Sequence, residues 1–591
     1  MLKPNRQSGT VRTGKLNRRV IMTTAIEETW PEGGRVVFLG RWCLRYSRSQ
    51  VWTKLDHTVA QYHWDDRSRI PQDLAYVSEV YEALLLELAE LLNEIHGVRH
   101  SVRYWRIVVG WWLFYFAQII FDRWRVVMTA SVAYPDATLL RLPHSEAIPA
   151  SSDMTAFIEA MVGDAWNERI FADLAERWTG LPVEVVEGAQ HPHSDSGKIP
   201  AMPDMVRQSR RGQVSGAGVA LNSVYLHRSE KIKLELLLHQ IPSIESKLSF
   251  PKARADPKRR NWVVNATDGD PFTRVVADLI PKYLPTCYLE GYAYASLKVE
   301  VEGPARTPRA VVTANAFSSD DGWKMWAGLQ CERGAKLVIA QHGGHYGTGA
   351  WSASQMHEIA SSDRYLSWGW RDLKHPTVRP APATKLIGMG RRRPMQTGRC
   401  LQVLASFPRL SYWMFSVPIG PQCQGYFDDQ FAFAGALSRQ VRDELIVRLN
   451  SNDYGWDQAQ RWKDVEPEIT TDNGRSDLST LLDHTRLYVA TYNATTFLES
   501  FTQGVPTVMF WNPEFWELSE SAKPFFDLLR EAGVLFDDPV TCALHVNSIW
   551  GDVPAWWASS NVQAAVKEFC NQYAFVGRRP LRDLKAALTQ W

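Results

Sequence analysis

The sequence predicts an α/β fold in which two Rossmann-like units of parallel strands and helices face each other across a cleft. Two stretches carry this prediction, residues 336–350 and 486–499, because each reads as an apolar strand, a polar or Gly-rich turn and the start of a helix. Such a turn points free backbone N–H groups and the positive helix end at one place, which suits a phosphate. The chain of 591 residues is also longer than one hydrophobic core normally serves.

The first predicted segment, residues 1–22, is a basic disordered tail. Residues 1–21 hold six Lys or Arg, no acidic residue and no apolar core of the kind a signal sequence needs. An upstream choice of start codon is the alternative, and the sequence leaves open whether Met1 or Met22 is the true start.

An N-terminal Rossmann-like acceptor domain with a helical insertion is predicted over residues 23–395. Its first buried strand is the apolar run 35–40. Residues 73–96 keep helical spacing of apolar positions and end at Gly97. The uncharged run 107–121 is shorter than the ~20 residues that span a bilayer, so a buried helix is expected and a membrane-dipping helix is the alternative.

Later elements repeat the order strand, helix, strand. A strand at 308–314, a helix at 322–333 and the strand at 336–340 form one βαβ unit. After a Pro-rich linker the alternation restarts, and we predict a C-terminal nucleotide-sugar-binding domain over residues 396–591. Its expected strands lie at residues 401–405, 445–449, 486–490 and 506–510.

The second turn is the predicted donor site. Thr495 and Thr496 stand at a helix start, where Thr is an accepted cap, and their hydroxyls and the free N–H groups suit a phosphate. Glu499 lies one turn further on, shares a face with Thr495 and can accept both hydroxyls of a ribose. Thr491 and Asn493 precede them in the same turn. The alternative is a capped helix with a surface Glu.

The first turn holds the main catalytic candidate, His342. Gly343 and Gly344 follow it, so the backbone there can approach a ligand closely or adopt a positive φ. Imidazole can accept a proton from a hydroxyl nucleophile. A structural donor is the alternative role for His342, and Tyr346 is a neighbouring candidate ligand contact.

Further candidates lie at other strand ends. Asp320 and Asp321 close the loop after strand 308–314, and either is the general base if His342 is not. Arg409 and Arg448 are candidate phosphate partners through their forked donors. A solvated or ion-paired Arg448 is the alternative.

Bulk composition excludes several classes of function. The net charge of +2 gives no whole-protein field for nucleic acid. The seven Cys form no CxxC pair or regular spacing, so neither a disulfide framework nor a metal site is expected. A zinc site at His342 and His345 lacks a third ligand in pattern. The reducing cytoplasm is the default location, and no cofactor is expected.

Four segments carry a resemblance to a known family: residues 23–31, 341–347, 362–370 and 491–496. From about Met22 to the C-terminus the chain resembles transferases found in bacterial O-antigen and surface-carbohydrate gene clusters. More distantly it is similar to two-domain GT-B glycosyltransferases, including Kdo transferases and the glycerophosphotransferases of teichoic acid synthesis. This likeness implies that His342 is the base and that Glu499, before Gly504, holds the ribose. The large helix-rich N-terminal half departs from the GT-B pattern.

The resemblance implies a metal-independent glycosyltransferase. Its donor is a nucleotide-activated sugar, and its acceptor is a surface glycan such as O-antigen, lipopolysaccharide or capsule, free or lipid-linked. A lipid-linked acceptor implies peripheral association with the inner membrane. Two alternatives remain open: transfer of a polyol-phosphate group, and a non-catalytic glycan- or nucleotide-binding scaffold.

Overall fold

The computed structural model describes residues 18–31, 33–144, 148–186, 218–243, 248, 250–265, 270–302, 307–411 and 413–591. Within these residues the strands form three separate parallel sheets rather than two, with helices packed around each sheet. The predicted α/β class with parallel sheets is therefore confirmed. Residues 23–395 contain one whole sheet and four of the five strands of a second one.

Sheet A has the strand order β3-β2-β1-β4-β5. Its central strand is β1, which lies inside the segment expected to be a disordered tail. Val20, Ile21 and Met22 are buried between parallel neighbours on both sides, so this apolar run forms a strand directly after the basic residues. The strands are β1 (Arg19–Met22), β2 (Arg35–Phe38), β3 (Asp56–Val59), β4 (Thr138–Arg141) and β5 (Val183–Val185).

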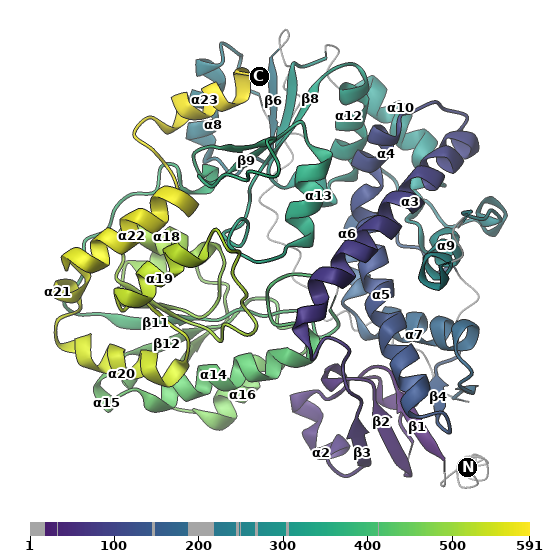
Figure 1. The fold of residues 1–591 in the computed structure, drawn as a ribbon, viewed down its shortest axis with the longest axis horizontal. Coiled ribbons are helices and arrows are strands. Elements are labelled where there is room, and N and C mark those ends of the chain that lie inside the picture. The colour runs from purple at the N-terminus through teal and green to yellow at the C-terminus, as the bar shows by residue number, and fades with distance from the viewer. Residues whose placement is uncertain are drawn as a thin grey trace, which may run out of the picture.

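A long helical crossover joins β3 to β4 and accounts for the predicted helical insertion. It contains α3 (Ile70–His96), α4 (Val102–Val108) and α5 (Gly110–Ala133), and it runs from sheet A to sheet B on the right of Figure 1. Gly97 ends α3 in the left-handed conformation, as predicted. Between β4 and β5 lie α6 (Met154–Met161) and α7 (Asp164–Trp178).

Helix α5 is enclosed by protein, as expected for the uncharged run. Every residue from Gly110 to Arg123 is buried, in contact with α3, α7 and α9 (Pro271–Tyr283). Among the described residues no single helix is long and apolar enough to cross a membrane. The pair α4 and α5, bent by 67° at their junction, meets that test by length and composition only.

Sheet B contains the first of the two predicted turns. Its order, β10-β9-β8-β7-β6, follows the sequence without a switch of direction. The His342 turn leaves the carboxyl end of β8 and leads to α13 (Ala353–Ser361). The strands are β6 (Val219–Asn222), β7 (Ala310–Thr313), β8 (Lys336–Ala340), β9 (Arg364–Ser367) and β10 (Val378–Pro380). The helices packed with them include α8 (Arg228–Leu237), α10 (Tyr292–Glu302), α11 (Ala316–Ser319) and α12 (Asp321–Glu332).

Sheet C has the doubly wound order β13-β12-β11-β14-β15-β16. Its direction reverses between β11 and β14, the position where such sheets place ligands at their carboxyl edge. The strands are β11 (Arg399–Val403), β12 (Leu445–Arg448), β13 (Thr470–Asp472), β14 (Thr485–Ala490), β15 (Thr507–Phe510) and β16 (Leu535–Phe536). The helices include α14 (Cys423–Ala436), α16 (Gln458–Val465), α18 (Thr495–Gln503), α19 (Lys523–Glu531), α20 (Pro539–Ile549) and α21 (Val553–Trp557).

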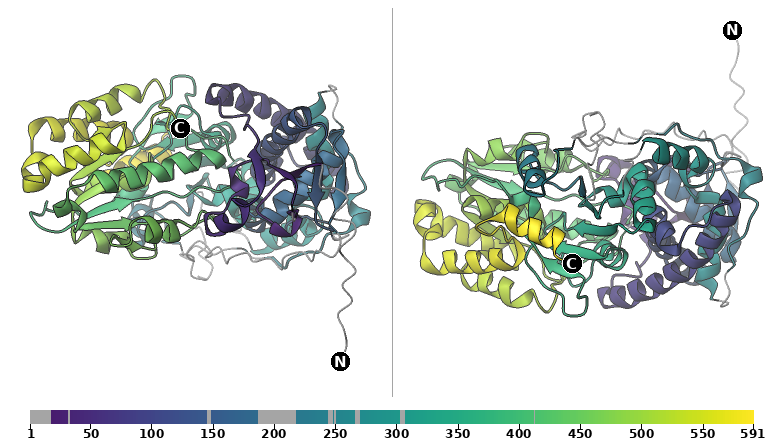
Figure 2. Two further views of the ribbon diagram at one scale, coloured as in Figure 1. Left: turned by 90° about the horizontal axis from the view of Figure 1, so that it is seen from below. Right: turned by 90° about the horizontal axis from the view of Figure 1, so that it is seen from above.

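The end of the chain returns from sheet C to sheet B. Helix α22 (Ser560–Tyr573) packs on α18 and α19, and α23 (Pro580–Thr589) then packs on α8. Between them Phe575 donates its N–H to the Trp368 carbonyl at 3.0 Å. The views from below and above show sheet C and these helices on one side, with sheet A and its crossover on the other (Figure 2).

Candidate functional site

The two predicted turns meet, one from sheet B and one from sheet C. The Gly344 N–H donates to the Thr495 hydroxyl at 3.0 Å, and the Asn493 side-chain amide donates to the Thr348 hydroxyl at 3.1 Å. A Cβ on Gly344 would lie 2.4 Å from the Ala494 carbonyl oxygen. The carboxyl ends of β8 and β14 therefore face each other, and Gly344 is required by the close approach of two backbones.

Gln341 fixes the shape of the first turn. Its amide donates to the Gly343 carbonyl at 2.7 Å, and its oxygen accepts from the Trp368 N–H at 2.9 Å and the Trp370 indole at 2.8 Å. Gly347 has a φ of +77°, and the Trp370 ring fills the space where its Cβ would lie. The aromatic residues after β9 thus form the support of the His342 turn.

His342 is partly accessible, with 23% of its side chain exposed. The Nδ1 atom is buried and lies 3.6 Å from Glu358 Oε1, and Nε2 lies 3.1 Å from the Tyr346 hydroxyl. Burial, with a smaller contribution from the nearby charge of Lys385, lowers the pKa of His342 to about 4. The imidazole is therefore neutral at pH 7, the form that can accept a proton.

Glu358 stands behind the imidazole on α13. It is 2% exposed, accepts from the Tyr346 hydroxyl at 3.2 Å, and burial raises its pKa well above the usual range. The hydroxyl of Tyr346 thus bridges the carboxyl group and His342 Nε2. The sequence analysis missed Glu358, although an acid within an otherwise apolar helix after the motif is a visible signal.

Helix α18 begins at the second turn without a side-chain cap. Its N-cap is Ala494, so Thr495 and Thr496 occupy the first turn and neither is the cap that was expected. The Thr495 hydroxyl accepts from Gly344, and the Thr496 hydroxyl donates to Tyr492 at 3.1 Å. The positive end of α18 consequently points at the junction with the His342 turn without a local carboxylate or hydroxyl cap.

Glu499 forms an ion pair that links the two sheets. Its Oε1 lies 2.8 Å from the ammonium of Lys385, which belongs to the short 3-10 turn Thr384–Leu386 after sheet B. The charge of Lys385 also contributes to the lowered pKa of His342. The same ammonium group therefore interacts with Glu499 on the sheet C side and with His342 on the sheet B side. The sequence analysis missed Lys385 because it lies in a segment read as a linker.

A family comparison decides what kind of protein this is. The model of the LIC12162 family transferases matches residues 19–588. The chain belongs to the LIC12162 family of transferases. The predicted family resemblance is confirmed, and the protein is an enzyme of the transferase class. No curated protein matches the chain.

Solved structures that resemble this LIC12162 family member include those of three proteins, WaaG, MurG and WaaB. The glycosyltransferase WaaG of lipopolysaccharide biosynthesis has 13% identity and a TM-score of 0.26, covering 51% of this chain and 96% of its own. Acinetobacter baumannii MurG has 10% identity and a TM-score of 0.33, covering 63% and 99%. The lipopolysaccharide outer core galactosyltransferase WaaB has 11% identity and a TM-score of 0.29, covering 50% and 78%. At these TM-scores no function follows from the likeness.

Two predicted donor contacts are structural in this family member. Thr491 is fully buried, where its hydroxyl donates to the Val403 carbonyl at 2.8 Å and lies 2.6 Å from the Tyr426 hydroxyl. Asn493 is buried against Thr348. Thr491 therefore ties the turn to β11 and Asn493 ties it to the turn after β8, which leaves the start of α18 as the part of this turn available to a ligand.

Asp320 and Asp321 do not join the His342 site. Asp320 is the N-cap of α12 and accepts the Trp323 N–H at 2.9 Å. Asp321 is buried, 2.6 Å from the Lys324 ammonium, and it accepts the Tyr288 hydroxyl at 2.5 Å and the Met154 N–H at 2.8 Å. These partners lie on α12, α6 and the 286–288 turn, so among the candidate bases only His342 reaches the junction.

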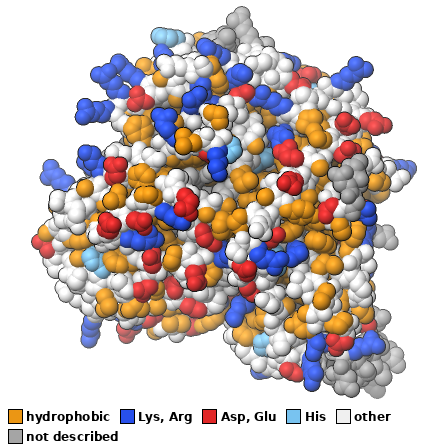
Figure 3. Space-filling view, in the orientation of Figure 1, with side chains coloured by type: hydrophobic (Ala, Val, Ile, Leu, Met, Phe, Trp, Pro, Cys, Tyr) orange, Lys and Arg blue, Asp and Glu red, His pale blue; other side chains and the backbone are white. Residues whose placement is uncertain are grey.

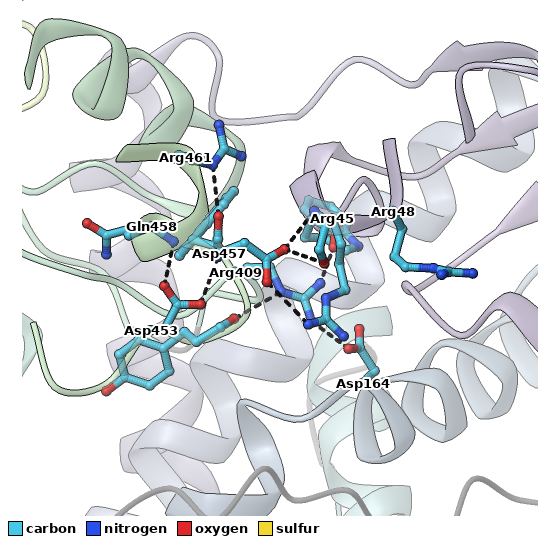
Figure 4. A network of polar contacts seen from close by, with 12 residues as sticks. Arg45, Arg48, Asp164, Arg409, Asp453, Asp457, Gln458 and Arg461 are labelled. Atoms are coloured by element: carbon cyan, nitrogen blue, oxygen red, sulfur yellow. Dashed lines mark hydrogen bonds and ion pairs between the residues drawn. The ribbon is translucent and has the colours of Figure 1, made fainter. Parts of the chain in front are cut away.

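Arg409 connects sheet C to sheet A rather than facing the junction. Its guanidinium donates to the carbonyls of Trp42 and Tyr454, and it forms an ion pair of 2.5 Å with Asp164 at the start of α7. Figure 4 shows Arg409 between Asp164 and the loop that carries Asp457. All three of its nitrogens are used in this way, which argues against a role in phosphate binding.

Arg448 likewise serves the structure of sheet C. It lies 2.9 Å from Asp472 and donates to the carbonyls of Gly474 and Ser476. This matches the ion-paired alternative and not the phosphate partner.

The described residues contain no group of three or more His, Cys, Asp or Glu arranged to hold a metal ion. His357 is stacked between Phe114 and Phe317, and burial lowers its pKa to about 3. His345 packs beside Phe415 with its ring against Gly349. Both imidazoles are therefore packed against neighbouring side chains or backbone inside the protein.

Proposed function

We propose that the protein is a metal-independent glycosyltransferase of GT-B type, which moves a sugar from a nucleotide-activated donor to a surface-glycan acceptor. The observation that carries this proposal is the junction of His342 with the start of α18, where a neutral imidazole, a helix amino end and the Lys385–Glu499 pair come together. A base next to an anion-binding helix end is the combination that transfer from a phosphate leaving group requires.

In this proposal the donor phosphates bind the first turn of α18. The N–H groups of Thr495 and Thr496 and the positive helix end stabilise the charge that develops on the leaving phosphate. Lys385 lies close enough to add a second positive charge, which takes the role that a divalent cation plays elsewhere. Glu499 accepts the ribose hydroxyls, and the Lys385 ammonium lies 2.8 Å from the same carboxylate.

The acceptor hydroxyl is proposed to lose its proton to His342. Because the Tyr346 hydroxyl donates to Glu358, Nε2 of the neutral imidazole carries the proton that it donates to Tyr346, and the free lone pair is on Nδ1. Nδ1 is buried in the structure, so the proposal requires the ring to turn until Nδ1 meets the acceptor hydroxyl, whose proton it then takes. A positioned base of this kind contributes about 10²–10⁴-fold to the rate.

The proposed location is the cytoplasm, where nucleotide-activated sugars are made. A lipid-linked acceptor would bring the enzyme to the inner membrane as a peripheral protein. Nucleic acid is not a proposed partner, because Lys and Arg lie interspersed with Asp and Glu on the face shown in Figure 3 and the net charge is +2.

The test combines donor binding with turnover. A thermal-shift screen with CMP, UDP, GDP and dTDP should show one nucleotide class stabilising the protein, by about 2.7 kcal/mol at one hundred times its Kd. With that donor class, H342A and H342Q should bind nucleotide normally and lose about 10²–10⁴-fold in kcat.

The outcomes separate the three functions. A free nucleoside diphosphate or CMP with a sugar on the acceptor supports glycosyl transfer, whereas CMP with a phosphodiester on the acceptor shows polyol-phosphate transfer. Unchanged donor turnover in H342A would refute the role of His342. Nucleotide binding without any turnover in the wild-type protein, tested with isolated surface glycan, would favour the non-catalytic scaffold.

A further inference from the structure

A recess of about 520 Å³ lies at the other end of α18 from the His342 junction. It is lined by Phe501, Thr502 and Gly504 at the carboxyl end of α18, by one face of α22 and by residues 574–578. At 1.5 Å per residue, the nine residues of α18 separate the two ends by about 12 Å. Its volume is within the range of small-molecule sites.

Both chain connections between sheets B and C pass this recess. Arg391 belongs to the segment that leads from β10 to β11, and residues 574–578 belong to the return from α22 to α23. The recess is therefore built from three separate parts of the chain that are held together by the domain arrangement.

Basic residues outnumber acidic ones in the lining of the recess. Arg391, Lys567 and Arg578 line it with a single carboxylate, Asp583. In the part of the chain that the structure describes, none of these three cations forms a hydrogen bond or an ion pair. Arg392, the next residue of the same connection, is fully engaged by contrast, with Asp483, Ser479 and Gln503 as partners.

The walls of the recess are aromatic and polar. Phe501, Trp557 and Phe575 supply rings, and the Asn571 amide supplies a donor and an acceptor. Aromatic faces with a few polar groups suit the apolar face and the hydroxyls of a sugar ring. Cations without carboxylate partners suit a phosphate or carboxylate substituent.

We propose that this recess binds an anionic saccharide, a sugar that carries a phosphate or a carboxylate group. The recess is separate from the His342 junction, and ligand binding to it can be measured without turnover. The test of this proposal is therefore independent of the test of the transferase mechanism. A ligand there contacts both connections between the sheets as well as α18.

The experiment is isothermal titration of the full chain with four probes at one ionic strength: glucose 6-phosphate, glucuronate, glucose and inorganic phosphate. At least one of the two anionic sugars should bind tenfold or more tightly than both glucose and phosphate. The preferred probe then distinguishes a phosphate-bearing ligand from a carboxylate-bearing one.

Variants locate the binding. K567Q/R578Q should weaken the preferred probe at least tenfold, whereas R393Q, an exposed cation of the same connection outside the lining, should change its affinity less than twofold. If the double variant fails to fold, R391Q at an exposed position gives the same comparison. E499Q should leave the affinity unchanged, because Glu499 lies in the middle of α18 and is not among the residues that line the recess.

Three results would overturn the proposal. The first is equal binding of all four probes, and the second is phosphate binding as tightly as glucose 6-phosphate. The third is an affinity that falls in E499Q but not in K567Q/R578Q, because the sugar phosphate would then occupy the His342 junction.

Discussion

Replacing Gly344 with alanine tests whether the contact between the two turns builds the site. The new Cβ would lie 2.4 Å from the Ala494 oxygen and 2.8 Å from Leu498 Cδ1. A carbon–oxygen contact is normally about 3.3 Å, so the two backbones must separate by about 1 Å. The Gly344–Thr495 hydrogen bond would then stretch from 3.0 Å beyond the usual range.

Two effects of G344A follow from that displacement. Overpacking of this kind costs about 1–3 kcal/mol in the free energy of unfolding. A misplacement of about 1 Å between a base and a bound donor costs on the order of 100-fold in kcat/KM. The measurements are urea unfolding and transferase turnover with the donor identified by the nucleotide screen.

Gly343 provides the matched control, since it lies next to Gly344 in the same turn. A Cβ there would have its nearest neighbour, the Tyr346 ring, at 3.4 Å, and its φ is not positive. G343A should therefore change the free energy of unfolding by less than about 0.5 kcal/mol. If G344A proves as stable and as active as G343A, the two turns do not depend on this close approach and the reasoning is wrong.

Three further predictions concern charge and metal. In a double-mutant cycle, K385A and E499Q should couple by about 1 kcal/mol in unfolding, discounted for the exposure of Lys385, and additive effects would contradict the ion pair. The pKa of His357 is lowered from 6.5 to about 3, so its contribution to stability is present above pH 6.5 and declines as the pH falls towards 3. H357F should reduce the slope of unfolding free energy between pH 6 and 4 by up to about 1.4 kcal/mol per pH unit, and an unchanged slope would show that His357 does not titrate there. EDTA should leave turnover intact, whereas dependence on Mn²⁺ would contradict metal independence.

The sequence predicts the two turns well because local chemistry specifies them. An apolar strand of four or five residues followed by Gly or small polar residues leaves few alternatives to a strand–turn–helix unit. Strands β8, β12, β14 and β15 accordingly lie where they were expected. The meeting of Gly344 with Ala494 was not visible in either stretch, since it depends on how two sheets pack.

Sheet A was harder to predict, for a physical reason. Its central strand β1 is only Arg19–Met22 and directly follows a basic segment. The apolar part of this strand is therefore too short to stand out as a strand pattern beside the charged residues before it. Arg409 and Arg448 were assigned to phosphate because a forked donor at a strand end suits an anion. In the folded chain each of these two guanidinium groups is instead bound by a carboxylate and by backbone carbonyls. Which groups lie beside them depends on the tertiary arrangement, which the local sequence does not show.

Sheet A also explains how the His342 turn is held. Arg67, where the crossover from sheet A begins, forms an ion pair of 2.6 Å with Glu517 and donates to the Val417 carbonyl at 3.1 Å. The carbonyl of Glu517 in turn accepts the Ala350 N–H at 2.9 Å. The end of the His342 turn is thus tied to a loop of sheet C that sheet A braces, although the turn itself grows from sheet B. A movement of sheet B relative to sheet C would therefore have to break both the Ala350–Glu517 and the Gly344–Thr495 hydrogen bonds.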